Sequence, residues 1–291
     1  MEFKDLEIFQ LVAEKGTITG AARELNYVQS NITSRIRKLE AEMKTPLFNR
    51  HRRGMSLTPE GKRLLTYTSK LLSLKEDMEQ SVQTDQEPSG KLEIGTIESV
   101  IHLPKILSSY VKQYKKVDLS LFTGVTVSLV SDVLNHKLDG AFVTERNFPS
   151  DIISHNVFEE ELVIVSDTNL SSLEALQDKT VLCFSEGCGY RARLMNWFKD
   201  QHMKPSKVME FGTLETILRS AVVGLGVAFV PISEVKKLHE ERQLYFHSLP
   251  EQYSKIRTVF IRRKDTHLTP TIQKFIDTIE DNEFTTASMI E

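Results

Sequence analysis

The N-terminal part of the chain places its apolar positions at helical spacing, interrupted by short polar breaks. This spacing predicts a first helix that ends near Lys15, ahead of a glycine, and a second short helix over 20–25 that Thr17 or Thr19 can cap. A third helix is expected from about Val28 to Met43, with one apolar face. Closely spaced helices of this kind are typical of a helix-turn-helix module.

The other face of the third predicted helix is polar and carries side chains that can contact base edges. Gln and Asn can pair with adenine, Arg with guanine, and Ser or Thr with bases or phosphates. The alternative interpretation is an ordinary solvated face. The candidate DNA-binding residues of this segment are Gln29, Ser30, Asn31, Thr33, Ser34, Arg35, Arg37 and Lys38, and Thr17 before the second helix is a further candidate.

Residues 47–58 predict a strand, a basic turn and a second strand. Arg50, Arg52 and Arg53 at the tip of such a hairpin suit phosphate contact or insertion into a minor groove, so the segment is interpreted as a wing. The charge distribution supports this interpretation. Residues 1–63 carry twelve Lys and Arg against eight Asp and Glu, a local charge of +4, although the whole chain has a net charge of −3.

Five spaced motifs follow one another along this part of the chain: Leu6-x-x-Phe9, Gly16-Thr17-x-Thr19-x-Ala21-Ala22-x-x-Leu25, Gln29-Ser30-x-Ile32-Thr33-x-x-Ile36-x-x-Leu39-Glu40, Pro46-Leu47-Phe48-x-Arg50-x-x-Arg53 and Leu57-Thr58-Pro59-Glu60-Gly61. In this order they resemble the LysR-type transcriptional regulators. The sequence departs from the commonest family pattern at Val28, where a small polar residue is usual, and at Thr33, where Ser is usual.

A long amphipathic pattern follows the predicted wing and runs to about Gln83. Thr58, Pro59 and Glu60 supply an N-cap, a proline suited to the first helical position and an acid in the first turn. Such a helix is either a core element or, as the resemblance implies, an antiparallel dimerisation helix, which we favour. Polar, helix-breaking residues 84–90 mark a hinge. The expected organisation is a DNA-binding domain over 1–58, a linker over 59–89 and an effector-binding domain over 90–291.

From Lys91 onward, short apolar strands alternate with helical segments, which predicts an α/β sheet with helices on both faces. The resemblance implies a two-lobed arrangement like that of periplasmic binding proteins. The first lobe is expected over about 90–162 plus 268–291 and the second over about 163–267, with chain crossings near 144–167 and 263–269. The predicted strands are 92–96, 119–123, 140–143, 162–165, 180–184, 207–211 and 227–230.

Ligands of open α/β folds bind beyond the carboxyl ends of strands, where helix N-termini present free N–H groups. This rule selects the segments 96–100, 124–127, 184–188 and 212–214. Their hydroxyls could bind a ligand or merely cap helices, and Arg191 could pair with a ligand carboxylate or form an ion pair between lobes. The candidate effector-binding residues are Thr96, Glu98, Ser99, Val100, Thr126, Val127, Ser185, Cys188, Arg191 and Thr213.

Composition and motifs exclude several other classes of protein. The longest apolar stretch, 221–232, is too short for a membrane helix, and residues 1–6 do not resemble a secretory signal, so we expect a cytoplasmic protein. No nucleophile elbow, zinc-protease, phosphate-loop or dinucleotide motif organises a catalytic site, and an enzyme is a remote alternative. We expect no catalytic residue, metal or cofactor. A thiol sensor is the nearer alternative, because Arg191 could lower the pKa of the Cys188 thiol.

The sequence therefore predicts a transcriptional regulator that binds double-stranded promoter DNA and responds to a small, carboxylate-type effector. The resemblance implies a homodimer or homotetramer that acts on RNA polymerase. In this interpretation the effector changes the spacing of the DNA-binding pairs.

Overall fold

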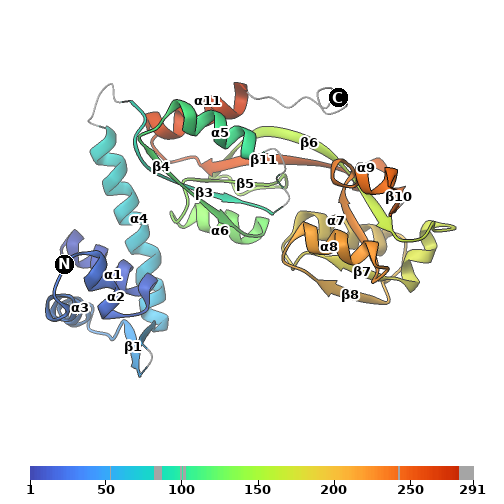
Figure 1. Ribbon diagram of the computed structural model, residues 1–291. Coiled ribbons are helices and arrows are strands. Elements are labelled where there is room, and N and C mark those ends of the chain that lie inside the picture. Colours follow the sequence, from blue (N-terminus) through green and yellow to red (C-terminus); the bar gives the residue numbers. More distant parts are fainter. Residues whose placement is uncertain (53, 82–86, 99, 101–102, 242, 282–291) are drawn as a thin grey trace. The chain divides into compact units, whose positions relative to one another are not determined.

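The computed structural model describes residues 1–52, 54–81, 87–98, 100, 103–241 and 243–281 (Figure 1). The chain divides into two compact units. The N-terminal unit contains the first four helices, and the C-terminal unit contains every element from β3 onward. No helix within these ranges is long and apolar enough to cross a membrane.

The N-terminal unit has the predicted three helices, hairpin and long helix. Phe9, Ile32 and Ile36 are fully buried and form the centre of its apolar core. The two hairpin strands are antiparallel, with Phe48 opposite Leu57. The elements are α1 (Phe3–Lys15), α2 (Ile18–Glu24), α3 (Gln29–Met43), β1 (Phe48–His51), β2 (Gly54–Leu57) and α4 (Pro59–Ser81).

Local chemistry explains where these helices begin and end. Gly16 takes a left-handed conformation, with φ of 66°, and ends α1. The Thr17 hydroxyl accepts a hydrogen bond from the Gly20 N–H and caps α2. The Thr58 hydroxyl accepts one from the Gly61 N–H at 3.0 Å, and Pro59 is the first residue of α4, as predicted.

The C-terminal unit is an α/β domain, as predicted. Leu103, Ile106 and Tyr110 of α5 are buried, Leu107 is partly buried, and the other positions between them face solvent, the pattern of a helix that covers a sheet. The elements are β3 (Gly90–Thr96), α5 (Leu103–Gln113), β4 (Val117–Thr123), α6 (Thr126–Leu134), β5 (Gly140–Thr144), β6 (Ile152–Ser166), η1 (Leu173–Asp178), β7 (Thr180–Cys183), α7 (Gly189–Asp200), β8 (Lys207–Glu210), α8 (Leu214–Val222), β9 (Val227–Pro231), α9 (Ile232–Glu240), β10 (Tyr245–Ser248), α10 (Glu251–Ser254), β11 (Lys255–Arg263) and α11 (Pro270–Asp281).

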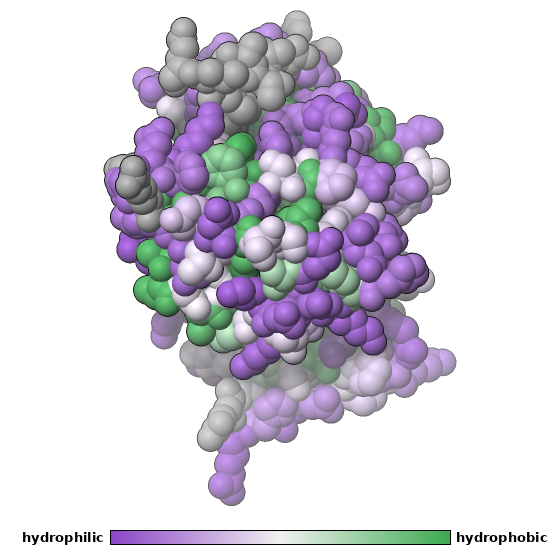
Figure 2. Space-filling view, turned by 90° about the vertical axis from the view of Figure 1, so that its right-hand side faces the viewer, coloured by the Kyte–Doolittle hydropathy of each residue, from purple (hydrophilic) through white to green (hydrophobic). Residues whose placement is uncertain are grey.

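One continuous sheet runs through both lobes in the order β4-β3-β5-β11-β6-β9-β7-β8, with β10 paired to β6. The pairs β3–β4, β3–β5, β7–β8 and β7–β9 are parallel, whereas β6 and β11 are antiparallel to each other. The face of the unit turned to the viewer in Figure 2 is mostly hydrophilic. The apolar sides of the strands and helices pack inside two separate cores, one in each lobe.

Both connections between the lobes are single long strands. Phe158 of β6 belongs to the first core and Leu162 of the same strand to the second. In β11, Ile256 belongs to the second core, whereas Val259 already packs in the first. The return crossing therefore lies within β11 and not at the expected 263–269. Only the last part of β6 was predicted, because its middle is rich in polar residues, including three consecutive glutamates, 159–161.

Candidate functional site

The polar face of α3 is available to a partner. The apolar side, with Ile32, Ile36 and Leu39, is buried against the other helices. Within the predicted set, Thr33 and Arg35 are partly buried, whereas the other members on α3 are exposed, namely Gln29, Ser30, Asn31, Ser34, Arg37 and Lys38. Val28 precedes them as the N-cap and is also exposed, without a side-chain cap bond.

Two of the predicted DNA contacts on α3 form ion pairs with carboxylates of the same chain. The Arg35 Nη1 lies 2.7 Å from Oδ1 of Asp5 and 3.5 Å from Oε2 of Glu2. The Lys38 Nζ lies 3.1 Å from Oε1 of Glu2. Arg35 thus connects α3 to the N-terminal end of α1, so its side chain has a structural role that the sequence did not reveal.

Asp5 is the centre of this network, and its side chain is only 1% exposed. Burial alone would raise the pKa of the Asp5 carboxyl. The hydrogen bond from the Glu2 N–H and the ion pair with Arg35 outweigh that effect and hold the pKa below its ordinary value. The ionised carboxylate therefore fixes the relative placement of α1 and α3.

The hairpin presents its arginines differently. Glu40 at the far end of α3 accepts hydrogen bonds from the Leu47 and Phe48 N–H groups, which fixes the start of β1. Arg50 lies near the same carboxylate, at 3.7 Å. Arg52 is exposed and forms no ion pair with any described residue. Arg53 lies outside the described residues.

The helix α4 has two apolar faces. Leu64, Leu65 and Leu72 pack against the core of the N-terminal unit. A second set of large side chains at positions i, i+4, i+7 and i+11 is exposed, and we call it the α4 stripe: Tyr67, Leu71, Leu74 and Met78. An exposed apolar stripe on an otherwise packed helix marks a surface for a partner.

The four segments selected from the sequence meet at one cavity in the C-terminal unit. This cavity, the strand-end chamber, has a volume of about 310 Å³. It lies where β3, β4, β7 and β8 end, and α7 and α8 begin beside it. Glu98 is the only charged group among the described lining residues, which are Ile97, Glu98, Thr123, Gly124, Val125, Phe184, Ser185, Cys188, Gly189, Phe211 and Gly212.

Three predicted effector residues, Glu98, Ser185 and Cys188, line the strand-end chamber. The hydroxyls of two others are already engaged: that of Thr96 donates to the Ile97 carbonyl, and that of Thr213 caps α8.

The remaining predicted residues stand elsewhere. Val100 belongs to the first core, and Ser99 lies outside the described residues. Arg191 does not line the chamber. Its Nη1 contacts Oε1 of Glu210 at 2.5 Å and donates to the Phe184 carbonyl oxygen.

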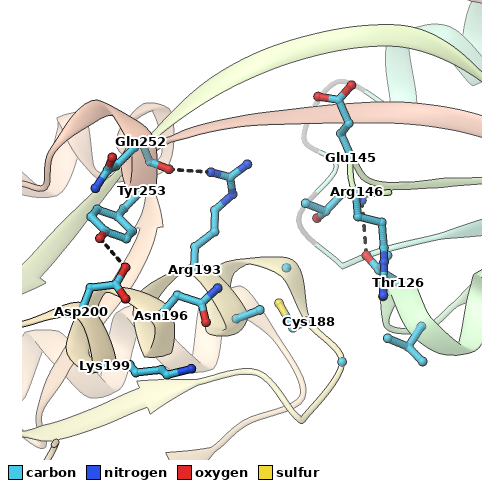
Figure 3. A pocket seen from close by; sticks show the side chains of 15 residues that line it. Thr126, Glu145, Arg146, Cys188, Arg193, Asn196, Lys199, Asp200, Gln252 and Tyr253 are labelled. Carbon is cyan, nitrogen blue, oxygen red and sulfur yellow. Dashed lines mark hydrogen bonds between the residues drawn. The ribbon is translucent and has the colours of Figure 1, made fainter. Parts of the chain in front are cut away.

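Thr126 and Val127 line a second cavity, the helix-side chamber, of about 680 Å³ (Figure 3). Gly187 and Gly189 explain why the two chambers are separate. A Cβ on Gly187 would lie 3.0 Å from Val125, and one on Gly189 only 2.5 Å from Thr144, so the loop before α7 packs tightly on the first lobe. Cys188 lines both chambers at this contact.

The sequence reasoning missed the polar side chains of the helix-side chamber. Arg193, Asn196, Lys199 and Asp200 occupy one face of α7, and Arg146 follows β5 in the first lobe. The spacing i, i+3, i+6 and i+7 was a usable signal, because it places these residues on one side of a helix. The strand-end rule did not select them, since they lie along a helix and not at its N-terminus.

Neither cysteine has the chemistry of a reactive thiol. Burial raises the pKa of the Cys188 thiol more than the nearby N–H groups and the Arg191 charge lower it. Burial also raises the pKa of Cys183 to about 11. Arg191 thus acts on Cys188 in the direction that the sequence suggested, but burial outweighs it, so the thiol-sensing alternative is not favoured.

A winged helix-turn-helix followed by a two-lobed α/β domain defines a class of protein: transcriptional regulators with an effector-binding domain. Residues 3–62 match the model of the bacterial regulatory helix-turn-helix proteins of the LysR family, and residues 85–283 match the LysR substrate binding domain. The chain belongs to the LysR family.

Curated relatives and solved structures agree with this assignment. The chain is 52% identical over 281 residues to the HTH-type transcriptional regulator SoxR of Arthrobacter sp. (strain TE1826), covering 97% of each. A full-length cysteine variant of OxyR from Pseudomonas aeruginosa superposes with a TM-score of 0.75 at 19% identity, covering 97% of this chain and 94% of that one. Full-length CbnR complexed with its target DNA superposes with a TM-score of 0.65 at 21% identity, covering 97% and 100%.

Proposed function

We propose that this regulator binds promoter DNA sequence-specifically, with α3 in the major groove and the β1–β2 hairpin as a wing. The exposed row of amide, hydroxyl and guanidinium groups on α3 supports direct contact with base edges. Arg52 supports a phosphate contact by the wing, since no described carboxylate neutralises it. The proposal is supported by full-length CbnR, a protein of the same fold whose structure was solved in complex with its target DNA.

The protein acts as a homodimer, or as a tetramer of two such dimers, on an inverted-repeat site. The α4 stripe supports this proposal because its four large side chains are left uncovered by the chain's own core. Two antiparallel copies of such a stripe would bury each other, in the manner of helix pairs.

The effector binds in the strand-end chamber. The observation that carries this proposal is that segments following β3, β4, β7 and β8 all line one cavity of about 310 Å³. A small carboxylate is the effector class that the N-termini of α7 and α8 favour, through backbone N–H groups and helix dipoles. Arg191 is paired with Glu210 and does not line the chamber, so in this proposal the carboxylate is bound by these N–H groups.

Binding of the effector changes the spacing of the DNA-binding pairs in the oligomer, and thereby DNA bending and access of RNA polymerase in the cytoplasm. In this scheme the two lobes respond through β6 and β11, the two strands that connect their cores.

A thermal-shift screen of organic acids with the full chain tests the effector site. A ligand of the folded state raises the melting temperature by mass action. Ser185→Tyr, which fills the chamber, should abolish the shift. Ser171→Tyr, at an exposed position of the same lobe, is the matched control and should retain it. A shift that survives in Ser185→Tyr would contradict the assignment of the effector to this chamber.

The salt dependence of binding to promoter DNA tests the wing. Arg52→Ala should weaken binding on all sequences and reduce the slope of log K against log[salt] by about 0.9, the value for one phosphate contact. An unchanged slope would remove Arg52 from the interface.

A further inference from the structure

The helix-side chamber holds three cationic side chains that form no close ion pair with a described carboxylate. Arg146, Arg193 and Lys199 line it, and within the described part of the chain none of them lies within ion-pair distance of a carboxylate. Two carboxylates share the chamber. The charge of Glu145 acts on Arg193 from beyond ion-pair distance, but the closest partners of both carboxylates are other residues. Glu145 lies 3.8 Å from Arg257, and Asp200 accepts a hydrogen bond of 2.6 Å from the Tyr253 hydroxyl.

Arg193 is the least solvated of the three cations. Its side chain is partly buried, and its Nη1 donates to the Gln252 main-chain oxygen at 3.2 Å, a neutral acceptor (Figure 3). Burial lowers the pKa of this guanidinium below its ordinary value. A charged group in such a place is destabilising unless an anion compensates it, and its planar fork suits a carboxylate or a phosphate.

The placement of the cations sets the size of the anion. Arg193 and Lys199 are six residues apart on α7, so their backbone positions lie about 9 Å apart along the helix, with Asn196 between them. Arg146 lines the chamber on the side of the first lobe, near Thr126. The cavity of about 680 Å³ lies within the range of about 300–1,000 Å³ that is usual for small-molecule sites. The arrangement fits a small molecule with two separated anionic groups.

We propose that the helix-side chamber is a second ligand site, distinct from the effector site, which binds a small dianion between Arg146 of the first lobe and Arg193 and Lys199 of the second. Because the cations come from both lobes, the bound dianion holds the lobes together. Cys188 and Gly189 line both chambers, so the second ligand acts on the walls of the first site. The site does not depend on which effector occupies the strand-end chamber.

Isothermal titration calorimetry of the full chain tests this site with two small molecules that each carry two separated anionic groups. Adipate is a dicarboxylate dianion, and fructose bisphosphate carries two phosphates of about −1.5 to −2 charge each at pH 7, so the two probes distinguish the two sources of negative charge. Hexanoate and fructose are the singly charged and neutral controls. Binding of either probe, at least about tenfold tighter than its control, is expected, because a charge-assisted contact is lost in each control.

Variants locate the bound dianion. Lys199→Gln changes an exposed side chain and should weaken binding about tenfold, and Arg193→Gln should weaken it at least as much. Arg219→Gln removes an exposed arginine of α8 outside the chamber and should bind normally. Ser185→Tyr should also bind the dianion normally, although it blocks the effector site.

The opposite results would overturn the proposal. They are absence of binding by both probes at millimolar concentration, equal binding by Lys199→Gln and the unmodified chain, or loss of binding in Ser185→Tyr. The last result would place the dianion in the strand-end chamber, whereas failure of the organic-acid screen alone would leave this second site intact.

Discussion

Two arginines that the sequence marked as ligand contacts, Arg35 in the N-terminal unit and Arg191 in the C-terminal one, are both paired with carboxylates of the chain. Their partners differ. Asp5 is 1% exposed, whereas Glu210 is 51% exposed. Glu210 is already solvated beside Arg191, whereas Asp5 depends on Arg35 and, at 3.9 Å, on Lys38 to compensate its charge. Loss of the arginine should therefore lower the free energy of unfolding more at Arg35 than at Arg191, although both form the same kind of ion pair.

Glu160 differs from both Asp5 and Glu210, because its carboxyl is buried and forms no ion pair with a described residue. It is 5% exposed on β6, and its Oε1 has no hydrogen-bond partner among the described residues. Burial raises its pKa to about 7, although the Tyr190 hydroxyl donates to its other oxygen. The three carboxyls thus differ in the compensation of their charge, and each difference can be tested.

The largest effect is expected for Arg35→Ala. The buried Asp5 carboxylate would lose its guanidinium partner and keep only Lys38, at 3.9 Å, and a buried carboxylate that loses its partner is destabilising. On heating, the loss of helical structure measured by circular dichroism should therefore begin at a clearly lower temperature than in the unmodified chain. Fluorescence of Trp197, the only tryptophan, reports on the second lobe and should be unaffected. Arg37→Ala is the matched control, and an equal shift in both variants would contradict the structural role of Arg35.

Glu160→Gln should stabilise the protein in a pH-dependent way. Below its ordinary pKa of 4.5 the carboxyl is protonated in folded and unfolded chains alike. Between about 4.5 and 7 only the unfolded chain releases the proton, so stability falls as the pH rises, and above 7 the deficit is constant. At pH 8 the variant should gain about 3 kcal/mol, from 1.36 kcal/mol per pKa unit.

Chemical denaturation of the unmodified chain and Glu160→Gln across pH 4–8 measures this difference. The exposed Glu161→Gln on the same strand is the control and should show a flat difference. A flat difference for Glu160→Gln as well would mean that its carboxyl is ionised in the folded protein at ordinary pH.

The sequence predicted helices and strands better than it predicted which side chains form ion pairs. Apolar periodicity determines α1, α3 and the short buried strands, and the strand-end rule brought four distant segments to one chamber. Spacing cannot reveal that Asp5 lies beside Arg35, thirty residues away, or that Glu210 faces Arg191. The lobe-connecting strand β6 was hidden for a related reason, since pairing with β11 tolerates glutamates that alternation rules count against a strand.

Arg191→Ala should have a small effect on stability, of about 1 kcal/mol or less, because Glu210 remains solvated. Trp197 fluorescence during urea unfolding measures it on the same helix, α7. Ligand shifts in the screen should persist in this variant. A loss of those shifts without a loss of stability would show that Arg191 contributes to effector binding. A large loss of stability would contradict the comparison with Arg35.

The smallest structural effect, and the sharpest functional one, is expected on the exposed face of α3. Arg37 has no ion pair among the described residues, whereas its neighbour Lys38 is held by Glu2 at 3.1 Å. Neither Arg37→Gln nor Lys38→Gln should change the melting temperature. Arg37→Gln should lower the salt slope of DNA binding by about 0.9, because a free cation can neutralise one phosphate. Lys38→Gln should lower the salt slope less, since Glu2 already compensates that charge in the free protein. Equal slopes for the two variants would show that an internal carboxylate does not decide which cations contact DNA.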